Sequence, residues 1–272
     1  MSKIAIVKGF VFGLVFGSLS PIPGISAGTL AMFFNVYEEF FNAFNWNHIK
    51  KNVLFSFCFV LGSICGLFGV SNLLMFFIDY HKHILLFSFI GLVLGCTPSI
   101  YLKAKTDKIN PGNIAAFSFS LAFMIFIAVF GGELSSNNTL EQLGGISFLL
   151  LVWVFISSFI SSAVMMIPGL GGSLMMLIFG IYTIYVEAIS MLNIPILFVL
   201  ITGMTFGFWA GVKIIKKMLE SYSKTLYSAI LGFIIGSTFI MYPGFVFGLE
   251  GLMSIALAVI LAGVAYHFSK VR

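Results

Sequence analysis

The chain has 272 residues, of which 60% are hydrophobic and 8% are charged, whereas an average soluble domain carries about 25% charged residues. This composition excludes a soluble enzyme. It also excludes a nucleic-acid-binding domain despite the formal net charge of +5, because the lysines lie in short stretches between apolar segments. We therefore predict a single all-α integral membrane domain over residues 1–272, with the bilayer as its main partner and no nucleic-acid partner.

The chain contains ten apolar segments, and a helix needs about 20 such residues to cross a bilayer. Helix is the expected state because a lipid-exposed backbone must satisfy its own hydrogen bonds. The first segment follows Lys3 and Lys8 like a signal peptide, but it lacks a small-residue cleavage site and is kept as part of the protein. The segments are 5–22, 24–44, 53–78, 84–102, 113–131, 146–166, 168–190, 195–217, 225–242 and 247–267.

The basic residues predict the orientation, since they favour the cytoplasmic side. With the N-terminus in the cytoplasm, only Lys82 of the fourteen basic residues lies outside. This count requires that segments 5–22 and 24–44 form a hairpin that enters and leaves on one side. Segments 146–166 and 168–190 must do the same from the opposite side. We therefore predict two re-entrant hairpins and cytoplasmic termini.

Both predicted hairpin tips carry the same motif, 145 positions apart and without a gap from Pro to Tyr. The first copy is Pro23-Gly24-Ile25-Ser26-Ala27-Gly28-Thr29, ending at Tyr37, and the second is Pro168-Gly169-Leu170-Gly171-Gly172-Ser173, ending at Tyr182. At an offset of 141, Gly91–Tyr101 matches Gly232–Tyr242, and Gly62 and Gly66 match Gly203 and Gly207. These matches predict two inverted repeats, about 5–131 and 146–267, each a Pro-Gly-tipped hairpin plus three transmembrane helices. Broken segments at matching places in two halves indicate a transporter's binding site.

The motif residues favour anion binding. Proline is tolerated in the first turn of a helix, so Pro23 and Pro168 are each predicted to mark a break followed by a helix start. The first N–H groups of such a helix are unpaired and carry the positive end of its dipole. Predicted substrate-binding residues are Pro23, Gly24, Ser26, Ala27, Gly28, Thr29, Pro168, Gly169, Gly171, Gly172 and Ser173. The competing interpretation is that each Pro-Gly is an ordinary tight turn between two complete spans.

Five further residues are predicted to support the site or ion coupling: Tyr37, Glu38, Thr97, Tyr182 and Thr238. For the threonines the alternative is hydrogen bonding to their own helix, and for the tyrosines it is anchoring at the membrane interface. The serines at 157, 158, 161 and 162 are interpreted as packing residues beside the second tip.

No cofactor, metal or catalytic set is predicted. Cys58, Cys65 and Cys96 lie within apolar segments and are interpreted as small hydrophobic residues. Asp79, His81 and His83 are close enough in sequence to suggest a metal, but they are explained more simply as a wet loop, because no further ligand is nearby.

The motif at 23–29, the following Tyr37-Glu38 and the second Pro-Gly hairpin resemble the bacterial polyprenyl-phosphate transporter family, over roughly 8–265. The resemblance implies a non-enzymatic flippase of the bacterial cytoplasmic membrane. Such a protein moves undecaprenyl phosphate from the outer to the inner leaflet, so that the carrier of peptidoglycan and other envelope glycans is recycled. Proton or sodium coupling, with Glu38 as the acidic residue, stays open, as does the oligomeric state. The chain departs from the family pattern at Ser20, Ala27, Glu39 and Gly171.

Two other functions remain compatible with the residues. A channel or secondary carrier for a small anion or solute would also be lined by opposed half-helices. A lipid phosphatase would release inorganic phosphate, although the sequence shows no catalytic set for it.

Overall fold

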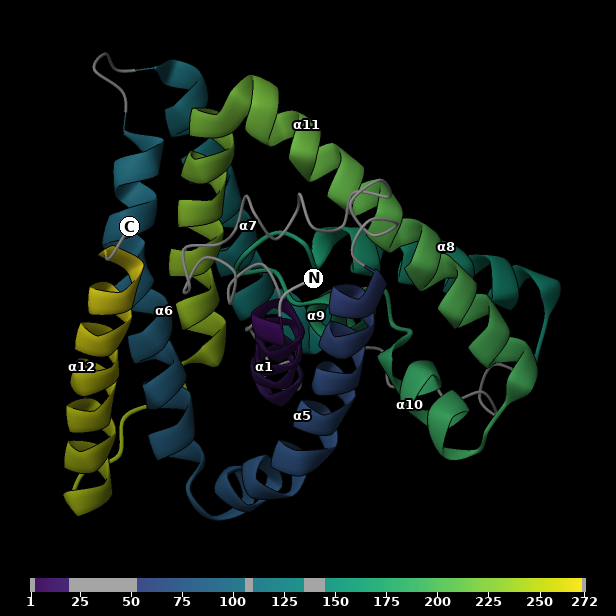
Figure 1. Ribbon diagram of the computed structural model, residues 1–272, viewed down its shortest axis with the longest axis horizontal. Helices are drawn as coiled ribbons and strands as arrows, with labels where there is room; N and C mark the ends of the chain where they lie inside the picture. Colours follow the sequence, from purple (N-terminus) through teal and green to yellow (C-terminus); the bar gives the residue numbers. More distant parts are fainter. Residues whose placement is uncertain (1–2, 20–52, 106–109, 135–144, 271–272) are drawn as a thin grey trace.

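The computed structural model describes residues 3–19, 53–105, 110–134 and 145–270, and every regular element within these ranges is an α-helix (Figure 1). The first Pro-Gly motif, Tyr37 and Glu38 lie outside the described residues. The helices are α1 Lys3–Leu19, α5 Val53–Tyr80, α6 Lys82–Ala104, α7 Pro111–Leu134, α8 Phe148–Val164, α9 Gly172–Ile178, α10 Tyr182–Ser190, α11 Ile194–Met241 and α12 Leu249–Lys270.

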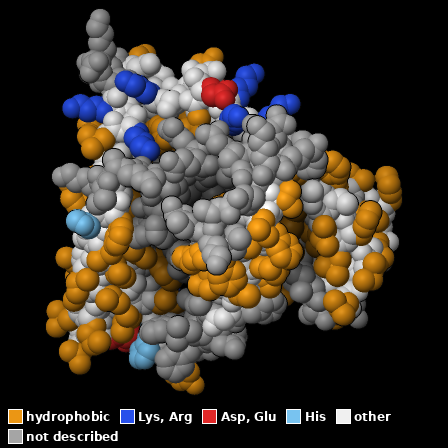
Figure 2. All heavy atoms as spheres, viewed as in Figure 1, with side chains coloured by type: hydrophobic (Ala, Val, Ile, Leu, Met, Phe, Trp, Pro, Cys, Tyr) orange, Lys and Arg blue, Asp and Glu red, His pale blue; other side chains and the backbone are white. Residues whose placement is uncertain are grey.

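The described helices are those of a membrane protein. Four of them, α6, α7, α11 and α12, are long and apolar enough to cross a bilayer. Large apolar side chains point outward along them, including Phe119, Phe198 and Val259, each more than 60% exposed. Figure 2 shows apolar side chains exposed over the lower part of this face, and lysine side chains at its upper end. In water such a surface would drive aggregation, whereas in lipid it is the expected outer surface, so the predicted all-α membrane class is confirmed.

Helix α11 joins two segments that the sequence predicts as separate, 195–217 and 225–242. Tyr222 alone has non-helical backbone angles, φ −137° and ψ 38°, and divides α11 into two limbs. His81, 141 positions earlier, separates α5 from α6 with nearly the same angles, φ −138° and ψ 41°. The two bends lie at opposite ends of the molecule (Figure 1).

The prediction that residues 168–190 form one helix is wrong, and so is the prediction that this helix starts at Pro168. The backbone leaves the helix at Met165, and α9 begins only at Gly172, four residues after the proline. A second interruption at 179–181 separates α9 from α10. The reason lies in the local turn chemistry around Pro168, described with the site below.

Two helix pairs pack in the same register, one in each half of the chain. A Cβ added at Gly62 of α5 would collide with the carbonyl oxygen of Phe10 in α1. In the second half, a Cβ at Gly203 of α11 would lie 2.8 Å from the carbonyl oxygen of Phe155 in α8. The contact recurs one turn further along, at Gly66 with Leu14 and at Gly207 with Phe159. These small residues let the backbones approach closely, as the glycine spacing predicts.

The two halves also exchange contacts with each other. Gly91 of α6 faces the backbone of Ala258 in α12, while Gly232 of α11 faces the carbonyl oxygen of Phe117 in α7. Gly232 lies 141 positions after Gly91, and Ala258 lies 141 positions after Phe117. A contact from the first half to the second is therefore matched by the equivalent contact from the second half to the first, the pattern that a two-fold relation produces.

Candidate functional site

The second Pro-Gly motif forms a tight turn. The N–H of Leu170 donates to the carbonyl of Ile167 over 3.1 Å, which places Pro168 and Gly169 at its two central positions. Gly169 has φ +88°, and this combination of proline followed by a positive-φ glycine is typical of a type II turn. The turn interpretation of the motif is therefore correct locally, although the turn joins a helix to a seven-residue helix rather than joining two complete spans.

The turn is buried near the middle of the helical bundle. A Cβ on Gly169 would lie 2.7–2.8 Å from backbone atoms of Phe233 and Ile234, close to the centre of the second limb of α11. Leu170 packs in one apolar cluster with Met124 and Ile127, near the centre of α7. Irregular backbone at membrane depth occurs only where protein or a cavity covers it, and this turn is covered by α7 and α11.

Helix α9 begins with backbone donors that have no acceptor within the helix. Its N-cap residue is Gly171, which has no side chain to accept a hydrogen bond, and the first helical bond runs from Met175 to the carbonyl of Gly171 over 3.2 Å. The N–H groups of residues 172–174 therefore have no acceptor within α9. Gly172 is buried and Ser173 is exposed. Because α9 has only seven residues, its dipole is weaker than that of the full helix expected from the sequence.

The two limbs of the second hairpin are tied together. The indole N–H of Trp153, near the start of α8, donates to the carbonyl of Phe179 over 3.1 Å, and their rings meet edge to face. Val154 shares an apolar cluster with Ile184 of α10 and Ile196 of α11. The chain that follows the turn thus runs back along α8 toward the start of that helix.

Three of the five supporting residues, Thr97, Tyr182 and Thr238, lie within the described part of the chain. The hydroxyl of Thr97 donates to Val93 over 3.4 Å and that of Thr238 donates to Ile235 over 2.6 Å, so both bond to their own helices. Tyr182 is exposed, with its ring 6.3 Å from that of Tyr185. These positions agree with the alternative interpretations given for them.

Ser157 and Ser161 of α8 are buried, as packing residues would be, but their hydroxyls are unpaired among the described residues. Both side chains are fully buried, and neither hydroxyl has a hydrogen-bond partner in the described part of the chain. Sequence reasoning treated them as packing residues. The available signal was their spacing of one helical turn, directly before the Pro-Gly break.

No group of three or more His, Cys, Asp or Glu side chains that could hold a metal ion occurs among the described residues. The three cysteines, Cys58, Cys65 and Cys96, are free.

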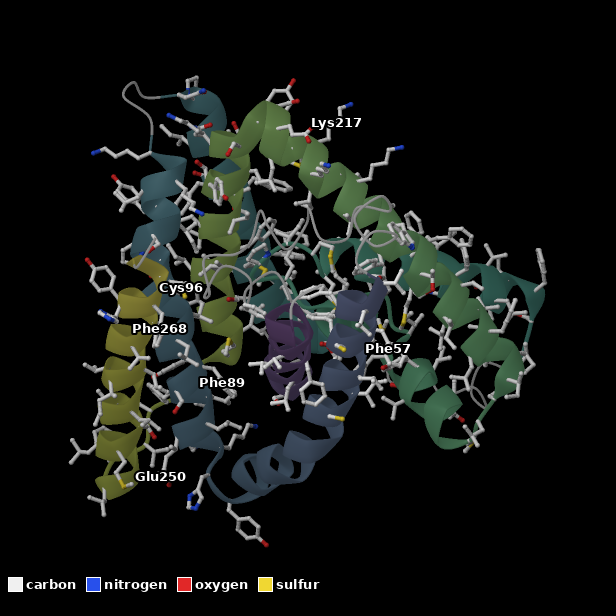
Figure 3. The ribbon with its side chains drawn as sticks, in the orientation of Figure 1. Phe57, Phe89, Cys96, Lys217, Glu250 and Phe268 are labelled. Atoms are coloured by element: carbon white, nitrogen blue, oxygen red, sulfur yellow. The ribbon has the colours of Figure 1, made fainter. Side chains whose placement is uncertain are left out.

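Charge is distributed unequally between the two ends of the molecule. Figure 2 shows lysine side chains gathered at the end where α11 bends. Figure 3 places Lys217 at that end and Glu250, in the first turn of α12, at the other. Helix α6 begins at Lys82 and carries Lys103 in its last turn, where the Lys103 Nζ lies 5.5 Å from the centre of the Tyr227 ring. The lysine predicted to lie outside is therefore a full helix length away from the basic end.

Comparisons with known proteins agree with the resemblance seen in the sequence. A family model described as undecaprenyl phosphate translocase-like matches residues 16–247. A polyprenyl-phosphate transporter from Staphylococcus aureus is 28% identical, with the match covering 89% of this chain and 86% of that protein. A polyprenyl-phosphate transporter from Vibrio cholerae is 21% identical, with the match covering 86% of this chain and 77% of that protein. No solved structure matches the chain significantly.

Proposed function

The chain belongs to the undecaprenyl phosphate translocase-like family, and from that premise we propose that it flips undecaprenyl phosphate from the outer to the inner leaflet of the bacterial cytoplasmic membrane. This transport would return the lipid carrier for further rounds of cell-envelope glycan synthesis, including that of peptidoglycan. The two relatives named polyprenyl-phosphate transporter support the substrate class.

The observation that carries the proposal for the site is the buried turn at 165–171. A lipid phosphate needs donors for its head group and an apolar flank for its tail. The turn presents the N–H groups of residues 172–174, which have no acceptor within α9, beside apolar residues of α7 and α11. We assign the head group to Pro168, Gly169, Gly171, Gly172 and Ser173, with the prenyl chain remaining in lipid.

We further propose that the protein is one membrane domain of two inverted repeats, about 5–131 and 146–267, that alternate access to the site. Two features support an inverted relation: the equivalent helix contacts of the two halves, and the equivalent bends at His81 and Tyr222 at opposite ends of the molecule. By the same relation, the motif at 23–29 would form the other side of the site. Tyr37 and Glu38 follow that motif, and Glu38 is the proposed coupling residue for protons or sodium.

Replacement of Gly172 tests the site. A Cβ at this position would lie 3.3 Å from the Ser161 carbonyl oxygen and 3.4 Å from the Met165 Cβ, so Gly172→Val should fold while blocking approach to the turn. We expect transport to fall about tenfold or more, since a lost hydrogen bond to a charged group is worth about 1.5–3 kcal/mol. The measurement is undecaprenyl phosphate exposed at the surface of cells that lack the protein and carry each variant.

The matched control is Gly263→Val, because a Cβ at Gly263 of α12 meets nothing within 4 Å. Deletion of the protein should raise surface exposure of the lipid, and the wild type and the control should lower it again. Unchanged exposure on deletion, with no paralogue compensating, would contradict the proposed function. Full activity of Gly172→Val would contradict only the site.

The orientation predicts opposite labelling of the two ends. Lys217 and Phe247 are both exposed. Phe247 lies two residues before α12, and the first turn of α12 holds Glu250 at the end opposite Lys217. With the three native cysteines replaced, a thiol from Phe247→Cys should react with an impermeant maleimide in intact spheroplasts. A thiol from Lys217→Cys should react only after permeabilisation, and the reverse pattern would contradict cytoplasmic termini.

A further inference from the structure

The second hairpin holds two buried hydroxyl groups that its own helix does not use. Ser157 and Ser161 are 0% exposed, and no hydrogen-bond partner for either Oγ lies within the described part of the chain. A serine within a helix ordinarily donates to the carbonyl three or four residues earlier. Three buried serines do so here: Ser120 donates to Ala116, Ser158 to Phe155 and Ser237 to Ile234. An unpaired donor in the protein interior is costly, so these two hydroxyls require an explanation.

The two serines lie on one face of α8, in the last three turns of the helix before the Pro-Gly turn. Val154, Ser157, Ser161 and Val164 are spaced three and four residues apart along one face of α8. Val154 packs with Met176 of α9. Val164 packs in a separate cluster with Met175. The two serines lie between these valines, on a face of α8 whose apolar clusters include residues of α9.

The start of α9 packs closely against this part of α8. Gly172, the first residue of α9, approaches the Ser161 carbonyl closely enough that an added Cβ would lie 3.3 Å from it. The backbone of α9 at Gly172 therefore lies close to the backbone of α8 at Ser161.

The hydroxyl pair belongs to the second hairpin alone. In the first repeat, the residues 145 positions earlier are Phe12 and Phe16. Helix α1 packs on α5 through the same glycine contacts as α8 on α11, although it has phenylalanines at these positions. The shared packing of the repeats therefore does not require serine at 157 or 161.

We propose that Ser157 and Ser161 donate hydrogen bonds to the phosphate monoester that the hairpin binds, an inference that rests on the proposed function. A phosphate offers several acceptor oxygens to the two hydroxyls. A bound cation would accept no hydrogen bond and would leave both hydroxyl protons unpaired. The phosphate enters when α9 moves away from α8, because α9 is seven residues long and non-helical backbone flanks it on both sides.

Alanine substitutions test the assignment in the full-length protein, purified into lipid nanodiscs. We expect affinity for undecaprenyl phosphate to fall about tenfold for Ser157→Ala or Ser161→Ala and about 100-fold for the double variant. The matched control is Ser158→Ala, because Ser158 is equally buried on the same helix but already donates to Phe155. This control should bind within about threefold of the wild type, since its hydroxyl is not free to reach the ligand.

Thermal stability without ligand gives a second readout. Removing an unpaired hydroxyl should leave the melting temperature unchanged or raise it, whereas a packing or bonding role for the serines would lower it. A double variant that melts at lower temperature without ligand would overturn the proposal.

Two probes separate the possible sources of the phosphate. Lipid binding that depends on the serines, with no binding of inorganic phosphate, supports a lipid head-group site. Serine-dependent binding of inorganic phosphate supports the same hydroxyl donors acting on a free anion. If the wild type and the double variant bind the lipid equally, the serine assignment is wrong and the proposed function stands. If the wild type binds no polyprenyl phosphate, the proposed function itself fails.

Discussion

Gly169→Ala is expected to unfold the second hairpin and abolish transport. An alanine at φ +88° adds about 1–2 kcal/mol of backbone strain. Its Cβ would lie 2.7–2.8 Å from main-chain atoms of Phe233 and Ile234, and backbone within a helix cannot move aside as a flexible side chain can. The turn must therefore shift away from α11, with an overpacking cost of about 1–3 kcal/mol. The sum is a large fraction of the stability of an average domain.

The measurement is the melting temperature and the yield of monodisperse protein in detergent. Gly244→Ala is the matched control, because Gly244 also has φ +88° but a Cβ there meets nothing within 4 Å. The control variant has the backbone strain without the collision, so its free energy of unfolding should fall by only about 1–2 kcal/mol. Equal losses in the two variants would show that the contact between the turn and α11 contributes little to stability.

The long helices could be predicted closely from the sequence. Predicted segments 84–102 and 113–131 differ from α6 and α7 by only two or three residues at each end. The reason is physical, because a backbone in lipid must form its hydrogen bonds within the segment and a helix does this. The polar residues that flank an apolar run then limit the length of the helix.

The interior of the second hairpin could not be predicted to the same degree. Proline followed by glycine suits both a helix start and a type II turn, and residues 168–173 alone do not distinguish the two. The packing of Gly169 against Phe233 and of Leu170 against Met124 favours the type II turn over a helix start. These contacts join residues far apart in the chain, which local patterns do not report.

The four serines of α8 could not be told apart from the sequence for a related reason. Most serines in apolar helices bond to their own backbone, and the four at 157, 158, 161 and 162 look alike in sequence. The structure separates Ser158, which donates to Phe155, from Ser157 and Ser161, which have no partner among the described residues. Whether a helical hydroxyl bonds to its own backbone depends on its side-chain conformation, which the residue type alone does not determine.

Gly91→Ala and Gly232→Ala are expected to destabilise the protein to similar extents, contrary to the usual effect of this substitution. In a helix interior, alanine is favoured over glycine by about 1 kcal/mol. Here a Cβ at Gly91 would strike the backbone of Ala258, and one at Gly232 would lie 2.5 Å from the Phe117 carbonyl oxygen. Each pair of helices must separate, which costs about 1–3 kcal/mol and exceeds the gain in helix propensity.

Gly263→Ala is the control, because its effect on the melting temperature should be absent or opposite in sign to that of Gly91→Ala and Gly232→Ala. It lies within α12, and its added Cβ meets nothing within 4 Å, so this variant should melt at the same temperature as the wild type or higher. Because the Gly91 and Gly232 contacts are equivalent across the two halves, both variants should lower the melting temperature, and the double variant should lower it further. A stable Gly232→Ala beside an unstable Gly91→Ala would mean that the halves do not share this contact in the membrane. The case for a two-fold relation between them would then rest on the sequence matches and the bends alone.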